Sequence, residues 1–272
     1  MQSKKPVEEL TDIDEDMPPC HTCNFGKQHR QPFPKQAWRG SKKLQLVHTD
    51  LCGPQRTPSL NGNLYYIAFI NDLIRMCWIF LLKQKSEVAG VFWKFKAKVE
   101  NEGTCLIQTI RSDNSKEYTS ETFNRFYEEA EIEHQLTAPY IPQQNDVSER
   151  RNRFIMEMTR CMLHKKDLPK RFWGKAANTV LCLQSRISTK DVKVLAPFEV
   201  WYGCKPSLKF LRVFGCLCFT YIPPVKRDKL DKKAEAAIFV GYNIISKAYR
   251  VFQPHISCVI VSRDVHFAGN EQ

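Results

Sequence analysis

Three acidic residues, each at the edge of an expected strand or helix, are of types and spacings that could do chemistry together. Asp50 lies in the segment LVHTDLCGP, Asp113 in IRSDNSKEY and Glu149 in PYIPQQNDVSERRNR, and 35 residues (114–148) lie between the last two. Transfer of a phosphodiester needs a nucleophile aimed in line at phosphorus and positive charge beside the phosphate oxygens. Two divalent ions about 3.5–4 Å apart supply both. The residue types therefore predict a two-metal polynucleotidyl transferase.

The expected cofactor is a pair of Mg²⁺ or Mn²⁺ ions, because these ions take hard oxygen ligands and retain several waters. We expect Asp50, at the end of a central strand, to bridge both ions, with Asp113 and Glu149 each completing one coordination shell. Three carboxylates brought together without metal would repel one another strongly. Metal binding should therefore be coupled to ordering of the site.

A basic helix that begins near Glu149 is the element expected to carry DNA. On a wheel of about 100° per residue, its apolar residues gather in one sector, namely Phe154, Ile155, Met158, Cys161 and Met162. Glu149, Asn152, Arg153 and Arg160 fall roughly opposite, while Arg151 falls near the apolar side. The alternative to a DNA-binding face is a solvated face, as most charged helix faces are. The residues expected to contact DNA, mainly through phosphates, are Gln144, Asn145, Arg150, Arg151, Arg153, Arg160, Lys165 and Lys166.

The bulk composition limits the class of protein. With 41 Lys and Arg against 29 Asp and Glu, the chain of 272 residues carries a formal net charge of +12, which suggests a polyanionic partner such as nucleic acid. Charge alone leaves a merely soluble basic protein equally open. The polar opening MQSKKPVEEL predicts no signal peptide, and no apolar run reaches the roughly 18 residues of a membrane span. We expect no membrane partner and an intracellular location with the eleven cysteines as free thiols.

The elements that must position the carboxylates follow from hydrophobic periodicity. The pattern predicts strands over 44–50, 64–70, 76–82, 106–111 and 132–136, and helices over 86–102, 119–130 and 170–187 besides the basic helix. Ser86 is the expected N-cap of the first helix, and Gly103 its expected end. Strands first and then βαβ crossovers predict an α/β fold with a mixed five-stranded sheet covered by helices. Short strands between turns after residue 208 predict a small β-barrel.

We expect four parts along the chain: a disordered N-terminus with a basic linker (1–43), the catalytic core (44–190), a connector (191–207) and the small β domain (208–272). The first part contains CHTC, in which Cys20 and Cys23 have the spacing of half a zinc site. A closed zinc site needs two more ligands, and no histidine precedes Cys20. An unmetallated remnant is therefore favoured over a working zinc site.

At HTDLCGP, RSDNSKEY and PQQNDVSERRNR, and from about Pro19 to Phe267, the chain closely resembles the integrase segment of Ty1/copia-type LTR retrotransposon polyproteins, especially plant elements. The resemblance implies an RNase H-like core, a DDE-type integrase that joins element DNA ends to a target duplex, and an SH3-like domain after the core. It implies Asp50, Asp113 and Glu149 as the metal ligands, and CHTC as half of an HHCC zinc domain. It further implies a homo-oligomer that acts in the nucleus and is otherwise cytoplasmic.

The sequence departs from the family pattern in two segments beside the triad. The family usually has DNGGE or DNGKE where this chain has Asn114, Ser115 and Lys116, and QQNG where this chain has Asp146. A lost glycine is expected to strain a turn that needs positive φ. These departures, with the missing zinc histidines and polyprotein segments, suggest a partial or decaying copy, and make a catalytically inactive nucleic-acid-binding module the main alternative. An RNase H-type nuclease on the same fold is a further, less favoured alternative.

Overall fold

The computed structural model describes residues 21–27, 38–137, 145–189 and 195–268, with the side chains of His21, Cys23 and Asn24 not described. The chain divides into a unit of residues 1–37, in which α1 (His21–Lys27) is described, and a unit of residues 38–272. Everything below concerns the second unit. No helix in the described ranges combines the length and the apolar character needed to cross a bilayer.

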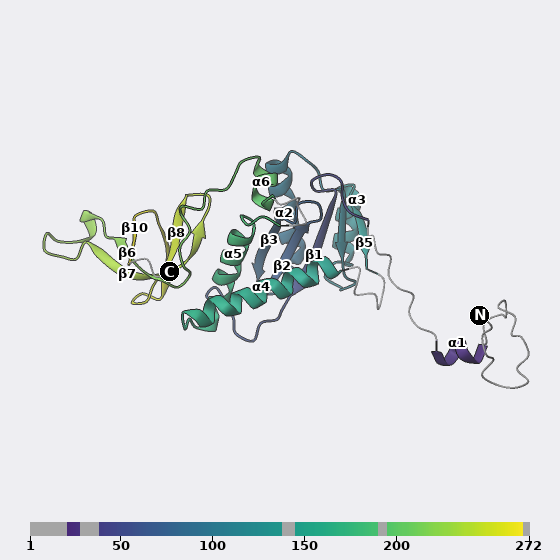
Figure 1. Cartoon of the computed structure of the whole chain (residues 1–272), viewed down its shortest axis with the longest axis horizontal. Coiled ribbons are helices and arrows are strands. Elements are labelled where there is room, and N and C mark those ends of the chain that lie inside the picture. The colour runs from purple at the N-terminus through teal and green to yellow at the C-terminus, as the bar shows by residue number, and fades with distance from the viewer. Residues whose placement is uncertain (1–20, 28–37, 138–144, 190–194, 269–272) are drawn as a thin grey trace, which may run out of the picture. The chain divides into compact units, whose positions relative to one another are not determined.

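The first sheet has five strands in the order β3-β2-β1-β4-β5 (Figure 1). Their bounds are β1 Leu46–Cys52, β2 Tyr65–Asn71, β3 Cys77–Leu82, β4 Thr109–Ser112 and β5 Glu133–Leu136. The pairs β1–β2 and β2–β3 are antiparallel, whereas β1–β4 and β4–β5 are parallel. The prediction of a mixed sheet with a central first strand is therefore confirmed, with boundaries shifted by one to three residues.

Helices cover both faces of this sheet because the central strands are apolar on both sides. Along β2, Ile67 and Phe69 enter one core and Tyr66, Ala68 and Ile70 enter the other, as the period of two requires. The helices are α2 Val88–Gly103, α3 Glu121–Glu129, α4 Asp146–Lys165, α5 Trp173–Gln184 and α6 Pro197–Tyr202. The first core contains side chains of α2, α3 and α6, and the second contains side chains of α4 and α5. Figure 1 shows α4 and α5 in front of the sheet and α2 behind it.

The start of α2 differs from the prediction. Residues Lys85–Glu87 form a 3-10 turn, and α2 follows at Val88 without a side-chain cap, so Ser86 is not the N-cap. The predicted end is confirmed, because α2 stops at Gly103 and Thr104 takes the left-handed conformation.

The C-terminal part forms a second sheet that is antiparallel throughout, in the order β10-β6-β7-β8-β9. Its strands are β6 Leu217–Tyr221, β7 Ala234–Asn243, β8 Ala248–Gln253, β9 Cys258–Ser262 and β10 Val265–Phe267. A separate core of Cys216, Cys218, Ala237, Phe239 and Val251 lies beneath it. This arrangement fits the predicted SH3-like domain. The nine described cysteines, from Cys52 to Cys258, are free thiols.

The predicted orientation of α4 is confirmed for Ile155 and Met162, which pack in the second core, and is wrong for the other residues of the predicted apolar side of the helix. Its buried residues are Ser148, Asn152, Ile155, Thr159 and Leu163, whereas the side chains of Phe154 and Met158 are 40% and 37% exposed and Cys161 is also exposed. The wheel assumed that the buried side would be the apolar one. Instead, small polar residues face the sheet, where they allow the helix to lie close to β1 and β2.

Candidate active site

The sheet brings the first two predicted carboxylates to the same edge. In the parallel pairing of β1 with β4, His48 lies opposite Arg111. Continuing that register by two residues sets Asp113, directly after β4, beside Asp50 in β1. Adjacent strands are about 4.8 Å apart, so the two aspartates emerge as neighbours from the centre of the sheet.

Helix α4 brings the third carboxylate to this edge. Asn152, on the buried side of α4, donates a hydrogen bond from Nδ2 to Asp50 Oδ2 at 2.8 Å. The hydroxyl of Tyr66 in β2 also approaches the Asn152 carbonyl at 3.5 Å. Glu149 lies three residues before Asn152, on the adjoining turn of the same side, and it is exposed. The hydrogen bond to Asp50 thus fixes where Glu149 stands relative to the sheet.

The electrostatics of Asp50 link all three carboxylates. Burial raises the pKa of Asp50, the Asn152 hydrogen bond lowers it, and the negative charges of Asp113 and Glu149 raise it further, to about 6 from an ordinary 3.8. The charges of both other members of the predicted triad therefore affect the pKa of Asp50. A buried carboxylate with two like charges nearby is poorly stabilised as an anion unless a cation is present.

The chemistry of these donors suits a hard divalent cation, because all three are carboxylates and the charges that act on Asp50 are the negative charges of the other two. Within the described residues, however, no three His, Cys, Asp or Glu side chains are close enough together to form a metal site. The three carboxylates face one region but are not drawn into a coordination shell.

Two residues beside the triad could not be recognised from the sequence. Asn152 was expected on the open face of α4, and only the three-dimensional packing reveals its contact with Asp50. Lys85 forms an ion pair with Glu117 at 2.6 Å. Its hydrogen bond and ion pair with Glu117 raise the pKa of Lys85, and the charge of Asp113 adds to this. Nothing in the local sequence around residue 85 signals a cation near Asp113.

The basic residues predicted to contact DNA fall into distinct environments. Arg153, Arg160 and Lys165 are exposed on α4. Arg150 is exposed too, but it pairs with Asp146 one turn earlier at 2.5 Å. The remaining basic residues, Arg151 and Lys166, are only partly exposed.

Arg151 points away from the open face, as its place on the wheel predicted. Its Nη2 donates to the Arg75 carbonyl at 3.3 Å. The side-chain stem of Lys166 packs against Gly215. The contact is so close that a Cβ atom added to Gly215 would lie 2.8 Å from the Lys166 Cβ.

The polar residues before α4 are less available than expected. Asn145 is buried, with its side-chain oxygen accepting a hydrogen bond from the Ser148 hydroxyl. Gln144 lies outside the described residues. The zinc pair cannot be placed either, because Cys20 is outside the described ranges and the Cys23 side chain is not described.

Comparisons with known proteins agree with this architecture. Residues 40–142 match the Integrase core domain family and residues 216–272 match the Retroviral polymerase SH3-like domain family. The chain is 42% identical over 253 residues to the Retrovirus-related Pol polyprotein from transposon TNT 1-94 of Nicotiana tabacum, covering 93% of this chain and 19% of that protein. It is 32% identical over 248 residues to the corresponding polyprotein from transposon RE2 of Arabidopsis thaliana, covering 91% of this chain and 17% of that protein. The chain thus spans under a fifth of the length of these relatives.

A solved structure shares the fold. The protein chain of a simian T-cell lymphotropic virus intasome, determined in complex with PP2A regulatory subunit B56 gamma, superposes with a TM-score of 0.55 at 15% identity, over 93% of this chain and 88% of that chain. At this identity the likeness establishes the fold alone. The chain therefore carries an RNase H-like integrase core domain followed by a retroviral SH3-like domain, and over most of its length it is related to the retrovirus-related Pol polyproteins of copia-like plant transposons.

Proposed function

We propose that this chain catalyses divalent-metal-dependent DNA strand transfer, in which a DNA 3′-hydroxyl attacks a phosphodiester of a target duplex. Asp50, Asp113 and Glu149 are the proposed metal ligands. The observation that carries the proposal is the state of Asp50. It accepts a hydrogen bond from the Asn152 side-chain amide, while burial, and after it the negative charges of Asp113 and Glu149, raise its pKa to about 6. Such a carboxylate is suited to a cation that the fold itself does not supply.

Each residue has a defined part in this proposal. Asn152 donates to Oδ2 of Asp50 and so orients the carboxylate that would serve as the central ligand. The backbone N–H of Ser115 donates to Asp113 Oδ1 at 3.2 Å and orients that side chain. When bound, two divalent ions would activate the attacking oxygen and neutralise charge at the phosphate. Ligation would also draw the three carboxylates closer together.

DNA is the proposed partner, both as element ends and as the target duplex. The exposed cations Arg153, Arg160 and Lys165 extend along α4 from Glu149, which suits contacts to successive phosphates. We further propose self-association, because strand transfer joins two DNA ends, and action in the nucleus, where the target duplex is.

The test is strand transfer in Mg²⁺ or Mn²⁺ by the wild type and by Glu149→Gln, which keeps the shape of the side chain and removes its charge. We expect the variant to lose at least about 100-fold in rate, as when one charge-stabilising group is removed from an active site. Glu157→Gln, an exposed glutamate further along α4, is the matched control and should stay within about twofold. Failure of the wild type to join DNA under conditions where an intact relative does so would exclude the activity.

A catalytically inactive DNA-binding module is the second candidate. The departures from the family pattern at Ser115, Lys116 and Asp146 are the reason to consider it. The expected strain from lost glycines does not favour it, because Ser115 and Lys116 are not among the residues with positive φ. Asp146 lies in the first turn of α4, where a negative charge is favourable. DNA binding with no strand transfer, unchanged by Glu149→Gln, would identify such a module.

A further inference from the structure

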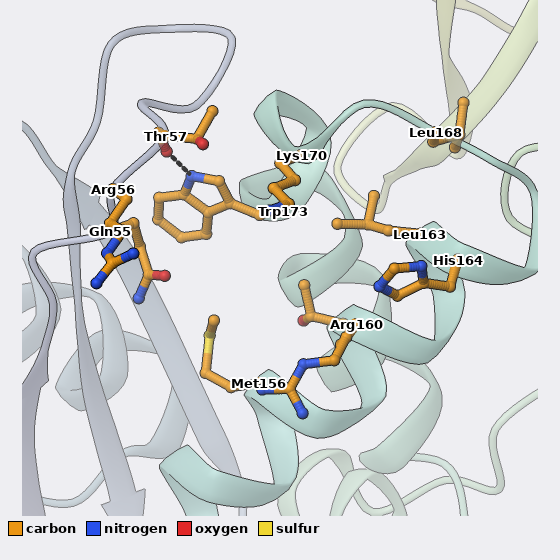
Figure 2. A pocket seen from close by; sticks show the side chains of 11 residues that line it. Gln55, Arg56, Thr57, Met156, Arg160, Leu163, His164, Leu168, Lys170 and Trp173 are labelled. Carbon is orange, nitrogen blue, oxygen red and sulfur yellow. Dashed lines mark hydrogen bonds between the residues drawn. The ribbon is translucent and has the colours of Figure 1, made fainter.

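A pocket of about 360 Å³ lies outside the triad, where three segments that are distant in the sequence meet (Figure 2). Its walls are residues 55–57 in the loop after β1, the second half of α4, and the turn that leads into α5. Its volume is within the range of small-ligand sites, which begins near 300 Å³.

The pocket is strongly cationic. Arg56, Arg160 and Lys170 line it from three different segments, and all three are exposed. No acidic residue lines the pocket, and none of these cations forms an ion pair with any described residue. Figure 2 shows the Arg56 and Arg160 side chains on facing walls. Unpaired positive charges that gather around a hollow attract an anion.

A buried hydroxyl in the pocket lacks a partner. Thr159 lines the pocket and is 1% exposed, and its Oγ1 makes no hydrogen bond. A threonine within a helix can donate to the carbonyl four residues earlier, and Thr159 does not do so. An unsatisfied buried hydroxyl is unfavourable, which marks this atom as one that a ligand would satisfy.

The remaining wall is apolar and rigid. The Trp173 indole, 4% exposed, donates from Nε1 to the Thr57 carbonyl at 3.0 Å, which ties the loop after β1 to α5 (Figure 2). Met156 and Leu163 complete this wall from α4. A mixture of cations with an aromatic and aliphatic wall is typical of sites that take a nucleotide, with the phosphate on the charges and the sugar or base on the apolar surface.

The position of the pocket along α4 suggests how DNA would reach it. Arg160 follows Glu149 by eleven residues, which corresponds to about 16 Å along the helix axis. A DNA strand rises 3.4 Å per nucleotide, so this distance corresponds to roughly five base pairs. The pocket therefore lies away from the site of the reacting phosphodiester, but the same duplex could reach both.

We propose that this pocket binds one phosphate-bearing nucleotide of a DNA strand, with its phosphate held by Arg56, Arg160 and Lys170 and by the Thr159 hydroxyl. The proposal rests on the proposed function in taking DNA as the substrate. It requires neither metal nor the three carboxylates, so binding at the pocket can be measured apart from strand transfer.

The first experiment measures binding of a labelled duplex to the full chain in EDTA, over a series of salt concentrations. Arg160→Gln with Lys170→Gln should weaken binding about tenfold and lower the slope of log K against log salt by about 1–2, because up to two phosphate contacts are lost. The control is Lys94→Gln with Lys98→Gln, an equal charge change at two exposed residues of α2, neither of which lines this pocket. Equal effects of the two pairs would overturn the proposal.

The second experiment uses Thr159→Val, which keeps the side-chain shape and removes the hydroxyl. We expect an unchanged or raised Tm, because no hydrogen bond is lost, together with DNA binding weakened about threefold or more. Thr159→Ser should restore binding. If Thr159→Val bound DNA as tightly as the wild type, the hydroxyl would have no part in a site.

The source of the phosphate is tested by titrating dAMP and inorganic phosphate against the same variants. Binding of either that depends on Arg160 and is tighter than binding of the duplex would assign the pocket to free phosphates and overturn the DNA assignment. The Glu149→Gln variant separates the two proposals, because it should lose strand transfer while binding DNA normally. If the wild type bound DNA through the pocket but did not catalyse strand transfer, the proposed pocket site would be supported and the proposed enzyme activity would be refuted.

Discussion

Two carboxylates in the same sheet, Asp72 and Asp50, have opposite electrostatic environments. Asp72 follows β2, is 3% exposed, and lies within hydrogen-bond distance of the Gly40 N–H at 2.8 Å, His48 Nε2 at 3.0 Å and Arg75 Nη1 at 3.1 Å. Burial raises the pKa of Asp72, but these partners outweigh it and lower the pKa to about 2. Burial also raises the pKa of Asp50, but its donors are only the Asn152 side chain and the Leu51 backbone N–H, and two negative neighbours add to the effect of burial, so the pKa rises to about 6.

The difference marks Asp72 as a structural carboxylate and makes Asp50 the candidate for a functional one. Asp72 receives its compensation from the fold, since one backbone and two side-chain donors surround it. Asp50 is left without such compensation, in a place where two more carboxylates face it. Groups with perturbed pKa values cluster at functional sites, and on this ground we propose a cation as the missing partner of Asp50.

The largest expected effect on stability is that of Asp72→Asn. Asparagine keeps one acceptor oxygen, but it removes the negative charge beside Arg75 and turns the other oxygen into a donor group. We therefore expect the free energy of unfolding to fall by about 3 kcal/mol. Urea denaturation at pH 7 measures this, with the exposed Asp228→Asn as control. Because the pKa of Asp72 is depressed from 3.8 to about 2 in the folded state, its stabilisation is present above about pH 4. The difference between wild type and variant should therefore shrink as the pH falls from about 4 to 2.

The change in the free energy of unfolding is expected to have the opposite sign for Asp50→Asn. The folded-state pKa of Asp50 is raised from 3.8 to about 6, so the wild type loses stability as the pH rises through this window. Without metal at pH 8, the neutral variant should be more stable by about 1–3 kcal/mol, and this gain should vanish near pH 4. A loss of stability at pH 8 would show that Asp50 is compensated as Asp72 is, and the contrast would fail.

Binding of Mg²⁺ is expected to have a smaller effect on stability. At Mg²⁺ about tenfold above its Kd, the wild type should gain about 1.4 kcal/mol of stability, seen as a rise in Tm that EDTA reverses. The gain should be weaker at pH 5 than at pH 7.5, because a proton on Asp50 competes with the ion. Asp72→Asn should retain the Tm rise and Asp50→Asn should lose it. Equal responses of the two variants would place the metal elsewhere.

The sequence predicted the sheet well because its signals are local. Continuous apolar runs mark β2 and β3 as strands buried on both faces, and the Phe92 and Phe95 stripe marks α2 as a covering helix. The edge positions of Asp50 and Asp113 follow from those elements. These features depend on hydrophobic patterns within a few residues, and such patterns can be recognised in a single sequence.

The rest could not be predicted because it depends on which segments meet. The orientation of α4 is set by its close approach to the sheet. Small polar residues such as Asn152 and Thr159 are therefore buried, although polar residues are usually exposed. The partners of Asp72 come from Gly40 and His48, more than 20 residues away. The pocket combines the loop at Arg56 with α4 and α5, and no periodicity connects them.

The smallest expected effect concerns the loop beside Asp113. Asp113 accepts from the backbone N–H of Ser115, a donor that any residue at this position except proline provides. Because Ser115 does not have positive φ, Ser115→Gly relieves no strain and adds backbone freedom to the unfolded chain. We expect stability to change by no more than about 0.5–1 kcal/mol downward and strand transfer to stay within about twofold. A large gain in strand transfer would mean that the loop, and not an absent cation, limits the site around Asp50, and that this copy is an enzyme impaired by its lost glycine.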